Sequence, residues 1–392
     1  MTFPPAAPPP YSPCPPYPSG PFTGPAADRA PAPAAAGQRL GYHRLAHVTG
    51  RHRWWRPLLG TLFVLVAYVL VVGLLDVLTS AAGAAHGYPD APDGTVAFGP
   101  LSGTAVDLLL IAAFLPVVLL AVRWTGRRPA GTVSSVTGRL RWPWLGRCLL
   151  VALPVLALSG GAMLLLPAPA DEPPAVWAGW EVFLPALALL LVLVPFQAAA
   201  EEYLFRGWLL QAVGAFVRSP WAAPLPQAVL FAAAHGWGTP WGFADLLVYG
   251  ALAGWLTACT GGLEAAIGLH VVNNLFAFGV SAALVDGLAS DETAADAPWA
   301  VVLTDLTGVA LYVAAVLWLA RRRPPARTAV ATPPAPPLPP PAHGSPYGPY
   351  APYGPHGSAA GFPPPYHAPS GPPGPPPGPP TGPPPGPEPA AP

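Results

Sequence analysis

Seven runs of about twenty apolar residues constrain the fold of this chain more than any other feature. A helix needs roughly 20 apolar residues to cross the hydrocarbon core of a bilayer, so runs of that length with few charges predict spanning helices. The runs are Leu58–Leu78, Leu101–Val122, Leu145–Leu166, Val182–Leu210, Phe243–Cys259, Leu263–Leu284 and Trp299–Leu319. They predict an all-α fold, a polytopic membrane helical bundle.

An eighth apolar segment is shorter, because Pro224 and Pro226 limit it to Leu225–His235. The loop charges argue that it also crosses, since arginine collects on the cytoplasmic side of a membrane. The arginine-bearing segments precede the first span, or follow the second, fourth and last ones: Arg39 to Arg56, Arg127 to Arg147, Arg218 and Arg321 to Arg323. The other long loops carry only acids. About eight spans with both termini cytoplasmic agree with this alternation.

Proline marks the two ends of the chain. Of the 62 prolines, 13 fall in residues 1–38 and 30 in residues 324–392. Such segments favour extended, solvated conformations that bury nothing. We therefore predict disordered tails over residues 1–50 and 324–392, three spans within residues 51–170 and a core over residues 171–323. The tails could recruit partners, although solvated spacers are the simpler interpretation.

Composition excludes several other classes of protein. Only 9% of the residues are charged, the charges balance and all 18 basic residues are arginine. No basic surface is available to neutralise phosphates, which argues against nucleic-acid binding. Cys14, Cys148 and Cys259 are too dispersed for a disulfide framework or a Cys-based zinc site. The preference for arginine over lysine is typical of GC-rich genes and indicates a bacterial plasma membrane. The first span is expected to be an anchor, because no cleavable signal peptide is recognisable.

Ionisable side chains inside spans are costly, so each one is a functional candidate. The fourth span contains Glu201, Glu202 and Arg206. Glu202 and Arg206 are four residues apart on one helix face and can pair, which could serve structure or catalysis equally. Glu201 points about 100° away and is expected to have no partner in its own helix. A lone carboxylate in these surroundings suits a general base.

The spans contain only two histidines, His235 and His270. Phe231 lies four residues before the first, and Asn274 lies four residues after the second, on the same helix face. A single buried histidine is usually a satisfied hydrogen-bond partner between helices. Two of them on separate spans, together with an unpaired glutamate on a third, predict a site.

Five further acids give weaker signals and are left out of the predicted site. Asp76, Asp107 and Asp305 lie towards the outer ends of their spans, where water is near. Asp245 and Glu264 begin their helices, where a negative charge favours the positive end of the helix dipole.

Three short motifs occur in order on separate spans, with gaps of 34 and 35 residues between Glu201, His235 and His270. They are Glu-Glu-x-x-x-Arg (Glu201, Glu202, Arg206), Phe-x-x-x-His (Phe231, His235) and His-x-x-x-Asn (His270, Asn274). Together they resemble the CPBP family of intramembrane proteases, which includes the CAAX prenyl endopeptidases and bacteriocin-processing or immunity-linked relatives. The resemblance covers about residues 180–285 and matches the family pattern at every motif position.

The resemblance implies hydrolysis of a peptide bond in a membrane-associated protein or peptide. It assigns water activation and orientation to Glu201 and His235, hydrogen bonding to the oxyanion to His270 and Asn274, and positioning of the fourth helix to Glu202 and Arg206. These six residues are the predicted catalytic set. The partners it implies are the lipid bilayer and a membrane-associated substrate.

A metal-free, glutamate-dependent peptidase is the favoured interpretation, and a metalloendopeptidase is the alternative. Glu201, His235 and His270 match the ligand set of a catalytic zinc with one position open for water. The compact His-Glu-x-x-His spacing of many zinc proteases is absent from the sequence.

Two functions of other classes stay open. Intramembrane Glu, His and Arg also mark transporters and proton relays, although no internal repeat of the spans is evident. A non-proteolytic bacteriocin-immunity or scaffold protein could keep the same fold and act through the proline-rich tails.

Overall fold

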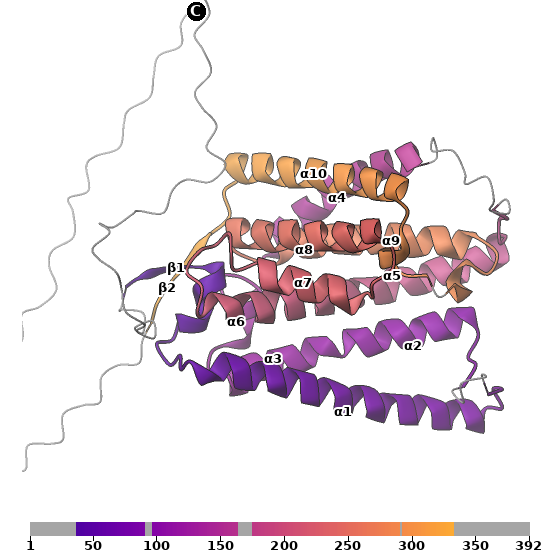
Figure 1. The fold of residues 1–392 in the computed structure, drawn as a ribbon, viewed down its shortest axis with the longest axis horizontal. Coiled ribbons are helices and arrows are strands. Elements are labelled where there is room, and N and C mark those ends of the chain that lie inside the picture. The colour runs from indigo at the N-terminus through magenta and orange to yellow at the C-terminus, as the bar shows by residue number, and fades with distance from the viewer. Residues whose placement is uncertain (1–36, 91–95, 164–174, 291, 333–392) are drawn as a thin grey trace, which may run out of the picture. The chain divides into compact units, whose positions relative to one another are not determined.

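The computed structural model describes residues 37–90, 96–163, 175–290 and 292–332, and the predicted tails outside these ranges are not among the described residues. The described chain is a bundle of helices with one two-stranded sheet (Figure 1). Its helices are α1 Trp55–Ala85, α2 Pro100–Ala112, α3 Phe114–Trp124, α4 Trp142–Met163, α5 Trp180–Glu202, α6 Leu210–Gly214, α7 Leu225–Ala234, α8 Pro240–Thr260, α9 Glu264–Ala283 and α10 Trp299–Arg322. A π-helix, η3 Tyr203–Leu209, joins α5 to α6. Short 3-10 turns complete the fold: η1 Tyr42–His47, η2 Ala130–Val133, η4 Gly287–Ala289 and η5 Ala294–Asp296.

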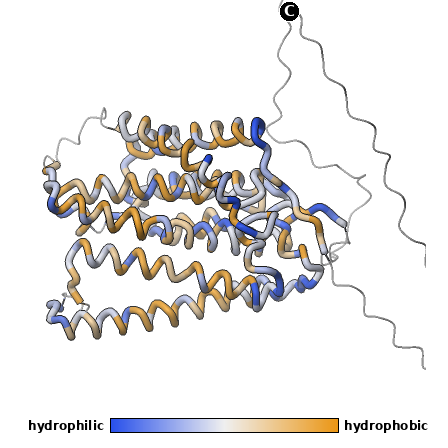
Figure 2. The backbone as a smooth tube through the Cα atoms, turned by 180° about the vertical axis from the view of Figure 1, so that it is seen from behind, coloured by the Kyte–Doolittle hydropathy of each residue, from blue (hydrophilic) through white to orange (hydrophobic). Residues whose placement is uncertain are grey.

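The predicted polytopic all-α bundle is confirmed. Within the described residues, seven helical segments are long and apolar enough to cross a membrane: Trp55–Ala85, Pro100–Trp124, Trp142–Met163, Trp180–Gly214, Pro240–Thr260, Glu264–Ala283 and Trp299–Arg322. Figure 2 shows the hydrophobic colour running along these helices, as expected for surfaces that face lipid.

The eighth predicted span, Leu225–His235, differs from the expectation. It forms only the ten-residue helix α7, about 15 Å long, which cannot cross a hydrocarbon core of roughly 30 Å alone. Pro224 and Pro226 delay its start, and the chain leaves the helix at His235. The chain still reaches the other face of the bundle here, because the Thr239 amide donates to the carbonyl of Ala295 in the loop before α10.

Both ends of the helical bundle lie on one face. This agrees with seven long helices and one further passage of the chain through α7 and the loop after it. Strand β1, Arg39–Gly41, pairs antiparallel with strand β2, Thr328–Val330, so that Leu40 lies opposite Ala329. The loop between α3 and α4 joins this face through an isolated bridge between Ser135 and Gly262. We call it the arginine-rich face, after the arginines of residues 39–56, 123–147 and 321–327.

Parts of both predicted tails, residues 37–50 and 324–332, are among the described residues, and the side chains of Tyr42 and Leu45 are fully buried. Arg44 Nη1 donates to the carbonyl of Gly214 over 2.7 Å. Residues 39–48 contain no proline and carry apolar side chains that pack beneath α6, which explains the burial.

Helix α9 lies at the centre of the bundle, in contact with α4, α5 and α8. Glycines permit the closest contacts. A Cβ at Gly160 of α4 would lie 2.5 Å from the Phe276 ring of α9, and one at Gly268 of α9 would lie 3.1 Å from Cys148 of α4. This packing presents the middle of α9 to the end of α5, where the predicted site lies.

Candidate active site

Glu201 and Glu202 are the last two residues of α5, directly before the π-helix η3. Both carboxylates are buried, and Glu202 is fully inaccessible. A π-helix widens the turn and is found frequently at functional sites. Here it follows immediately after the two acids and contains Arg206.

Glu202 connects the first motif to the third. Its Oε1 accepts a hydrogen bond from Arg206 Nη1 at 2.9 Å and lies 2.8 Å from His270 Nδ1. The predicted pairing of Glu202 with Arg206 is therefore present. Because a carboxylate accepts, we assign the proton of this bond to Nδ1 of His270, which leaves Nε2 to face the site.

Arg206 is buried completely and lies among aromatic rings. Its Cζ is 4.0 Å from the centroid of the Phe231 ring and 5.6 Å from that of Tyr249. Two of its nitrogens, Nε and Nη2, have no hydrogen-bond partner among the described residues. Cation–π attraction therefore supplements the single bond to Glu202 in stabilising this charge.

Glu201 has a partner in its own helix, contrary to expectation. Gln197, four residues earlier, donates from Nε2 to Glu201 Oε1 over 2.7 Å. Gln197 Oε1 in turn accepts from Asn274 Nδ2 at 3.0 Å. Gln197 was not among the predicted site residues, although a glutamine one helical turn before a buried glutamate is a signal that could have identified it.

The second oxygen of Glu201 is free. Oε2 is buried, has no hydrogen-bond partner in the described part of the chain and lies 3.7 Å from His270 Nε2. That separation exceeds a direct hydrogen bond and is within the range of an ion pair with a protonated imidazole. The two atoms thus face each other inside an apolar bundle.

His235 lies beside this network without bonding to it. Its Nδ1 bonds to the carbonyl of Phe231 at 2.9 Å, and its ring centroid is 4.7 Å from the Phe231 ring. The Phe231 ring also meets His270 edge-on, with centroids 6.1 Å apart. His235 is half-buried and at the end of α7, and among the described residues no hydrogen bond joins it to Glu201 or His270.

The structure brings five of the six predicted residues together in two hydrogen-bonded groups, Glu201 and Asn274 with Gln197, and Glu202 with Arg206 and His270. The two groups form one polar network through the 3.7 Å contact between Glu201 and His270. His235 is separated from it by one aromatic ring. In the described ranges, no group of three or more His, Cys, Asp or Glu side chains is arranged to hold a metal ion. The zinc ligand set of Glu201, His235 and His270 is therefore not assembled in this geometry.

One of the acids left out of the prediction has a structural partner. Glu264 is fully buried, and its Oε2 lies 2.6 Å from Arg141 Nη2. Arg141 also donates to Glu264 Oε1 from its backbone amide and from Nε, both over 2.8 Å. Glu264 therefore links the start of α9 to the segment before α4 through Arg141, in addition to any interaction with the helix dipole.

Comparison with known proteins agrees with the motifs. Residues 183–276, which contain both glutamates, both histidines and the asparagine, match the family model "Type II CAAX prenyl endopeptidase Rce1-like". The chain is 32% identical over 187 residues to the uncharacterized protein YyaK of Bacillus subtilis (strain 168). The aligned residues make up 45% of this chain and 62% of YyaK. The chain thus spans less than two thirds of that relative. No solved structure matches the chain. The family resemblance predicted from the motifs is confirmed for this segment.

Proposed function

We propose that the protein is an intramembrane endopeptidase that hydrolyses a peptide bond of a membrane-associated protein or peptide, with Glu201 as the general base. Residues 183–276 match a family of CAAX prenyl endopeptidases, which supports proteolysis at the level of the family. The observation that carries the proposal is the free, buried Oε2 of Glu201 opposite His270 Nε2 at 3.7 Å. A base with one oxygen held and the other free is positioned to take a proton from water.

In the proposed reaction Glu201 Oε2 takes a proton from a water, whose oxygen bonds to the carbonyl carbon of the substrate. The carbonyl oxygen becomes an oxyanion, which accepts hydrogen bonds from His270 Nε2 and from the second N–H of Asn274 Nδ2. His270 must then carry protons on both ring nitrogens. The C–N bond breaks as Glu201 returns its proton to the leaving amine.

The supporting residues would keep this geometry fixed. Gln197 holds Glu201 Oε1 and Asn274 at the same time, so base and oxyanion donor are aligned by one amide. Glu202 holds His270 through Nδ1 and is itself anchored by Arg206. His235 donates to the Phe231 carbonyl from Nδ1, which leaves Nε2 as an acceptor that could orient the water.

The proposal includes an orientation in the membrane. Arginine collects on the cytoplasmic side, so we place the arginine-rich face in the cytoplasm and the loops before α5 and α10 outside. A relative from a bacterium agrees with a bacterial plasma membrane.

The test is cleavage by purified protein. The full chain and the variants Glu201→Gln, His235→Ala and His270→Ala would be treated with a chelator in detergent and assayed on a panel of labelled, membrane-tethered peptides, with bound metal measured in the same samples. Glu181→Gln, at the start of α5, is a matched control. Loss of cleavage in the three site variants but not in the control supports the glutamate-based reaction.

Other outcomes are equally informative. Cleavage that returns only after zinc is added would move Glu201, His235 and His270 into ligand roles. Proton flux through proteoliposomes that depends on Glu201, with no cleavage of any peptide, would replace the protease by a proton relay using the same network.

A further inference from the structure

A wide hollow of about 800 Å³ opens at the arginine-rich face, between the end of α3 and the segment that precedes α1. Its wall includes four arginines, Arg51, Arg123, Arg127 and Arg128, together with Trp124. None of the described residues that line it is acidic. The hollow lies apart from the Glu201 network, which is inside the bundle.

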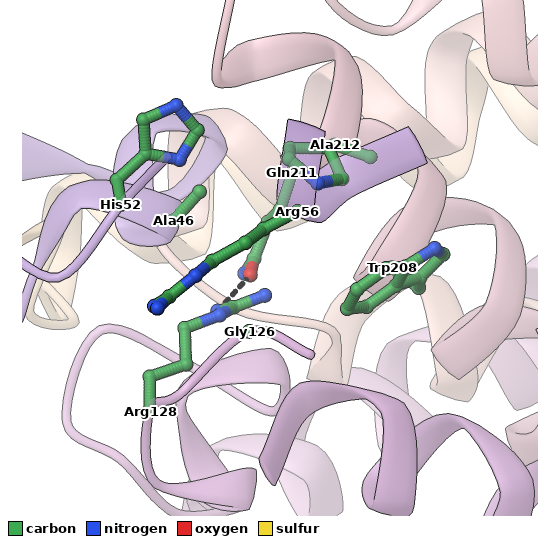
Figure 3. A pocket seen from close by; sticks show the side chains of 9 residues that line it. Ala46, His52, Arg56, Gly126, Arg128, Trp208, Gln211 and Ala212 are labelled. Carbon is green, nitrogen blue, oxygen red and sulfur yellow. Dashed lines mark hydrogen bonds between the residues drawn. The ribbon is translucent and has the colours of Figure 1, made fainter. Parts of the chain in front are cut away.

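Arg128 is the unusual member of this wall, because it is buried without a counter-charge. Only 5% of it is exposed, and its Nη1 donates to two neutral acceptors, Thr132 Oγ1 at 2.9 Å and Gln211 Oε1. Figure 3 shows the bond to Gln211 in a narrower neighbouring pocket, which Arg128 also lines. No carboxylate pairs with Arg128 in the described part of the chain.

The charge on Arg128 persists at neutral pH. Burial lowers the pKa of its guanidinium to about 10, which is still far above 7. A buried charge without a counter-charge destabilises the folded protein unless a partner compensates it. Arg128 is therefore a buried cation at the edge of an open hollow, with no anionic partner among the described residues.

The backbone beside Arg128 is also unusual. Arg127 has φ of 52°, in the left-handed region that non-glycine residues adopt rarely and with backbone strain. Its neighbour Gly126 would have tolerated this conformation more easily. The strained turn places two consecutive guanidiniums on the wall of the hollow.

Exposed tryptophans indicate the position of the hollow relative to the membrane surface. Trp124 ends α3, and Trp54 and Trp55 lie at the start of α1, with exposed fractions of 62%, 61% and 43%. Exposed tryptophans collect at the level of the lipid head groups. The hollow therefore opens where the phosphates of a membrane leaflet lie.

The general preference for arginine in cytoplasmic loops explains the exposed side chains of Arg51, Arg123 and Arg127. It does not explain a concave wall or a buried guanidinium without an acid. Guanidinium groups bind phosphate through paired, charge-assisted hydrogen bonds, and anionic lipids are concentrated on the cytoplasmic leaflet.

We propose that the hollow formed by Arg51, Arg123, Arg127, Arg128 and Trp124 binds the phosphate of an anionic phospholipid head group. The bound phosphate neutralises Arg128. Because Arg128 holds Gln211, the occupied hollow also stabilises α6, at the end of the helical segment that carries Glu201. The proposal does not depend on proteolysis.

The test measures lipid binding to the full chain in nanodiscs. Discs of phosphatidylcholine alone are compared with discs that contain phosphatidylglycerol, and retained lipid is counted by native mass spectrometry alongside the melting temperature. The variant Arg51→Gln/Arg127→Gln changes two exposed residues of the wall and spares the buried bonds of Arg128. Arg139→Gln/Arg147→Gln removes two exposed arginines outside the hollow as the matched control.

We expect phosphatidylglycerol to raise the melting temperature of the wild type and of the control. In the hollow variant, affinity for the anionic lipid should fall on the order of tenfold or more, since each arginine near an anionic surface contributes about 1 kcal/mol. Equal loss in both double variants would overturn the proposal in favour of diffuse attraction to the membrane. If inorganic phosphate alone produced the same stabilisation in phosphatidylcholine discs, the ligand would be a soluble phosphate and the lipid assignment would be wrong.

Discussion

Glu202 Oε1 lies 2.8 Å from His270 Nδ1, and this one contact joins two motifs that are 68 residues apart in the chain. The same oxygen accepts from Arg206, so one carboxylate fixes both a histidine on α9 and a guanidinium in η3. Glu201 and Glu202 each have one oxygen, Oε2, that is buried without a hydrogen-bond partner among the described residues. The two differ in their neighbours: Glu202 Oε1 is shared by Arg206 and His270, whereas Glu201 Oε2 lies 3.7 Å from His270 Nε2.

Replacing Glu202 by alanine should destabilise the protein strongly. Breaking a buried ion pair from one side costs about 3–5 kcal/mol, because the remaining charge is left without compensation. Thermal unfolding in detergent should show the loss for Glu202→Ala and for Arg206→Ala. The double variant should lose clearly less than the sum of the two, and additive losses would contradict the coupling inferred from the 2.9 Å contact.

Replacing Gln197 by leucine should lower cleavage far more than its loss of stability accounts for. Gln197 aligns Glu201 with Asn274, and misplacement of a catalytic group by about 1 Å can cost on the order of 100-fold in rate. The rate constant and the melting temperature should be measured on the same samples.

The matched control for Gln197 is Gln227→Leu, which also removes a buried glutamine. Among the described residues, Gln227 bonds only to the backbone carbonyls of Pro224 and Gly250, away from the network. It should lower the melting temperature more than the rate. A rate for Gln197→Leu equal to that of this control would contradict a positioning role.

Local spacing accounts for much of what could be predicted. Runs of apolar residues indicated the spanning helices, and the four-residue spacing of Glu202 and Arg206 indicated their pairing. Contacts between helices are decided by packing, so the bond of Glu202 to His270 was not predictable from local spacing. Gln197 was not predicted because burying a neutral amide in a span costs less free energy than burying a charge, so its presence there is a weaker signal of function.

The differences from expectation also have physical causes. Prolines shortened α7, and the buried apolar side chains of Tyr42 and Leu45 pack the segment before residue 50 against the bundle, although proline-rich sequence precedes it. Glu264 was interpreted from its place at a helix start, whereas its partner, Arg141, lies 123 residues earlier and could be found only in three dimensions.

Replacing Arg141 by alanine should destabilise the arginine-rich face. The Arg141 side chain is 12% exposed and Glu264 is fully buried, so the cost should be near the lower end for a buried pair, about 3 kcal/mol. Arg141 also donates to the carbonyl of Ala326, just before β2, so β2 should exchange its amide hydrogens faster. Arg139→Ala, an exposed neighbour, should change the unfolding free energy by no more than about 0.5 kcal/mol. Equal melting temperatures for the two variants would exclude this role for the Arg141–Glu264 pair.

Acidification should release the segment η1 from the bundle. His47 is 1% exposed, its Nε2 bonds to the carbonyl of Ala215 at 3.0 Å, and its Nδ1 is buried without a hydrogen-bond partner in the described chain. Burial, followed by the charge of Arg44, lowers the pKa of His47 to about 4 in the folded protein, against an ordinary 6.5. The docked segment thus holds the neutral imidazole, and the undocked segment binds a proton more readily.

The sign of the pH dependence follows from these two pKa values of His47. Docking is fully stable above pH 6.5, weakens as the pH falls from about 6.5 to 4, and changes no further below. At pH 5 the amide protection of residues 42–47, corrected for intrinsic exchange, should be on the order of tenfold lower than at pH 7.5. His52, 4.2 Å away between ring centroids, has its pKa lowered to about 4 by burial and adds to the same effect. His47→Gln should remove part of the pH dependence and His47→Gln/His52→Gln more of it, whereas unchanged protection of the wild type between pH 7.5 and 5 would show that η1 stays docked when these histidines are protonated.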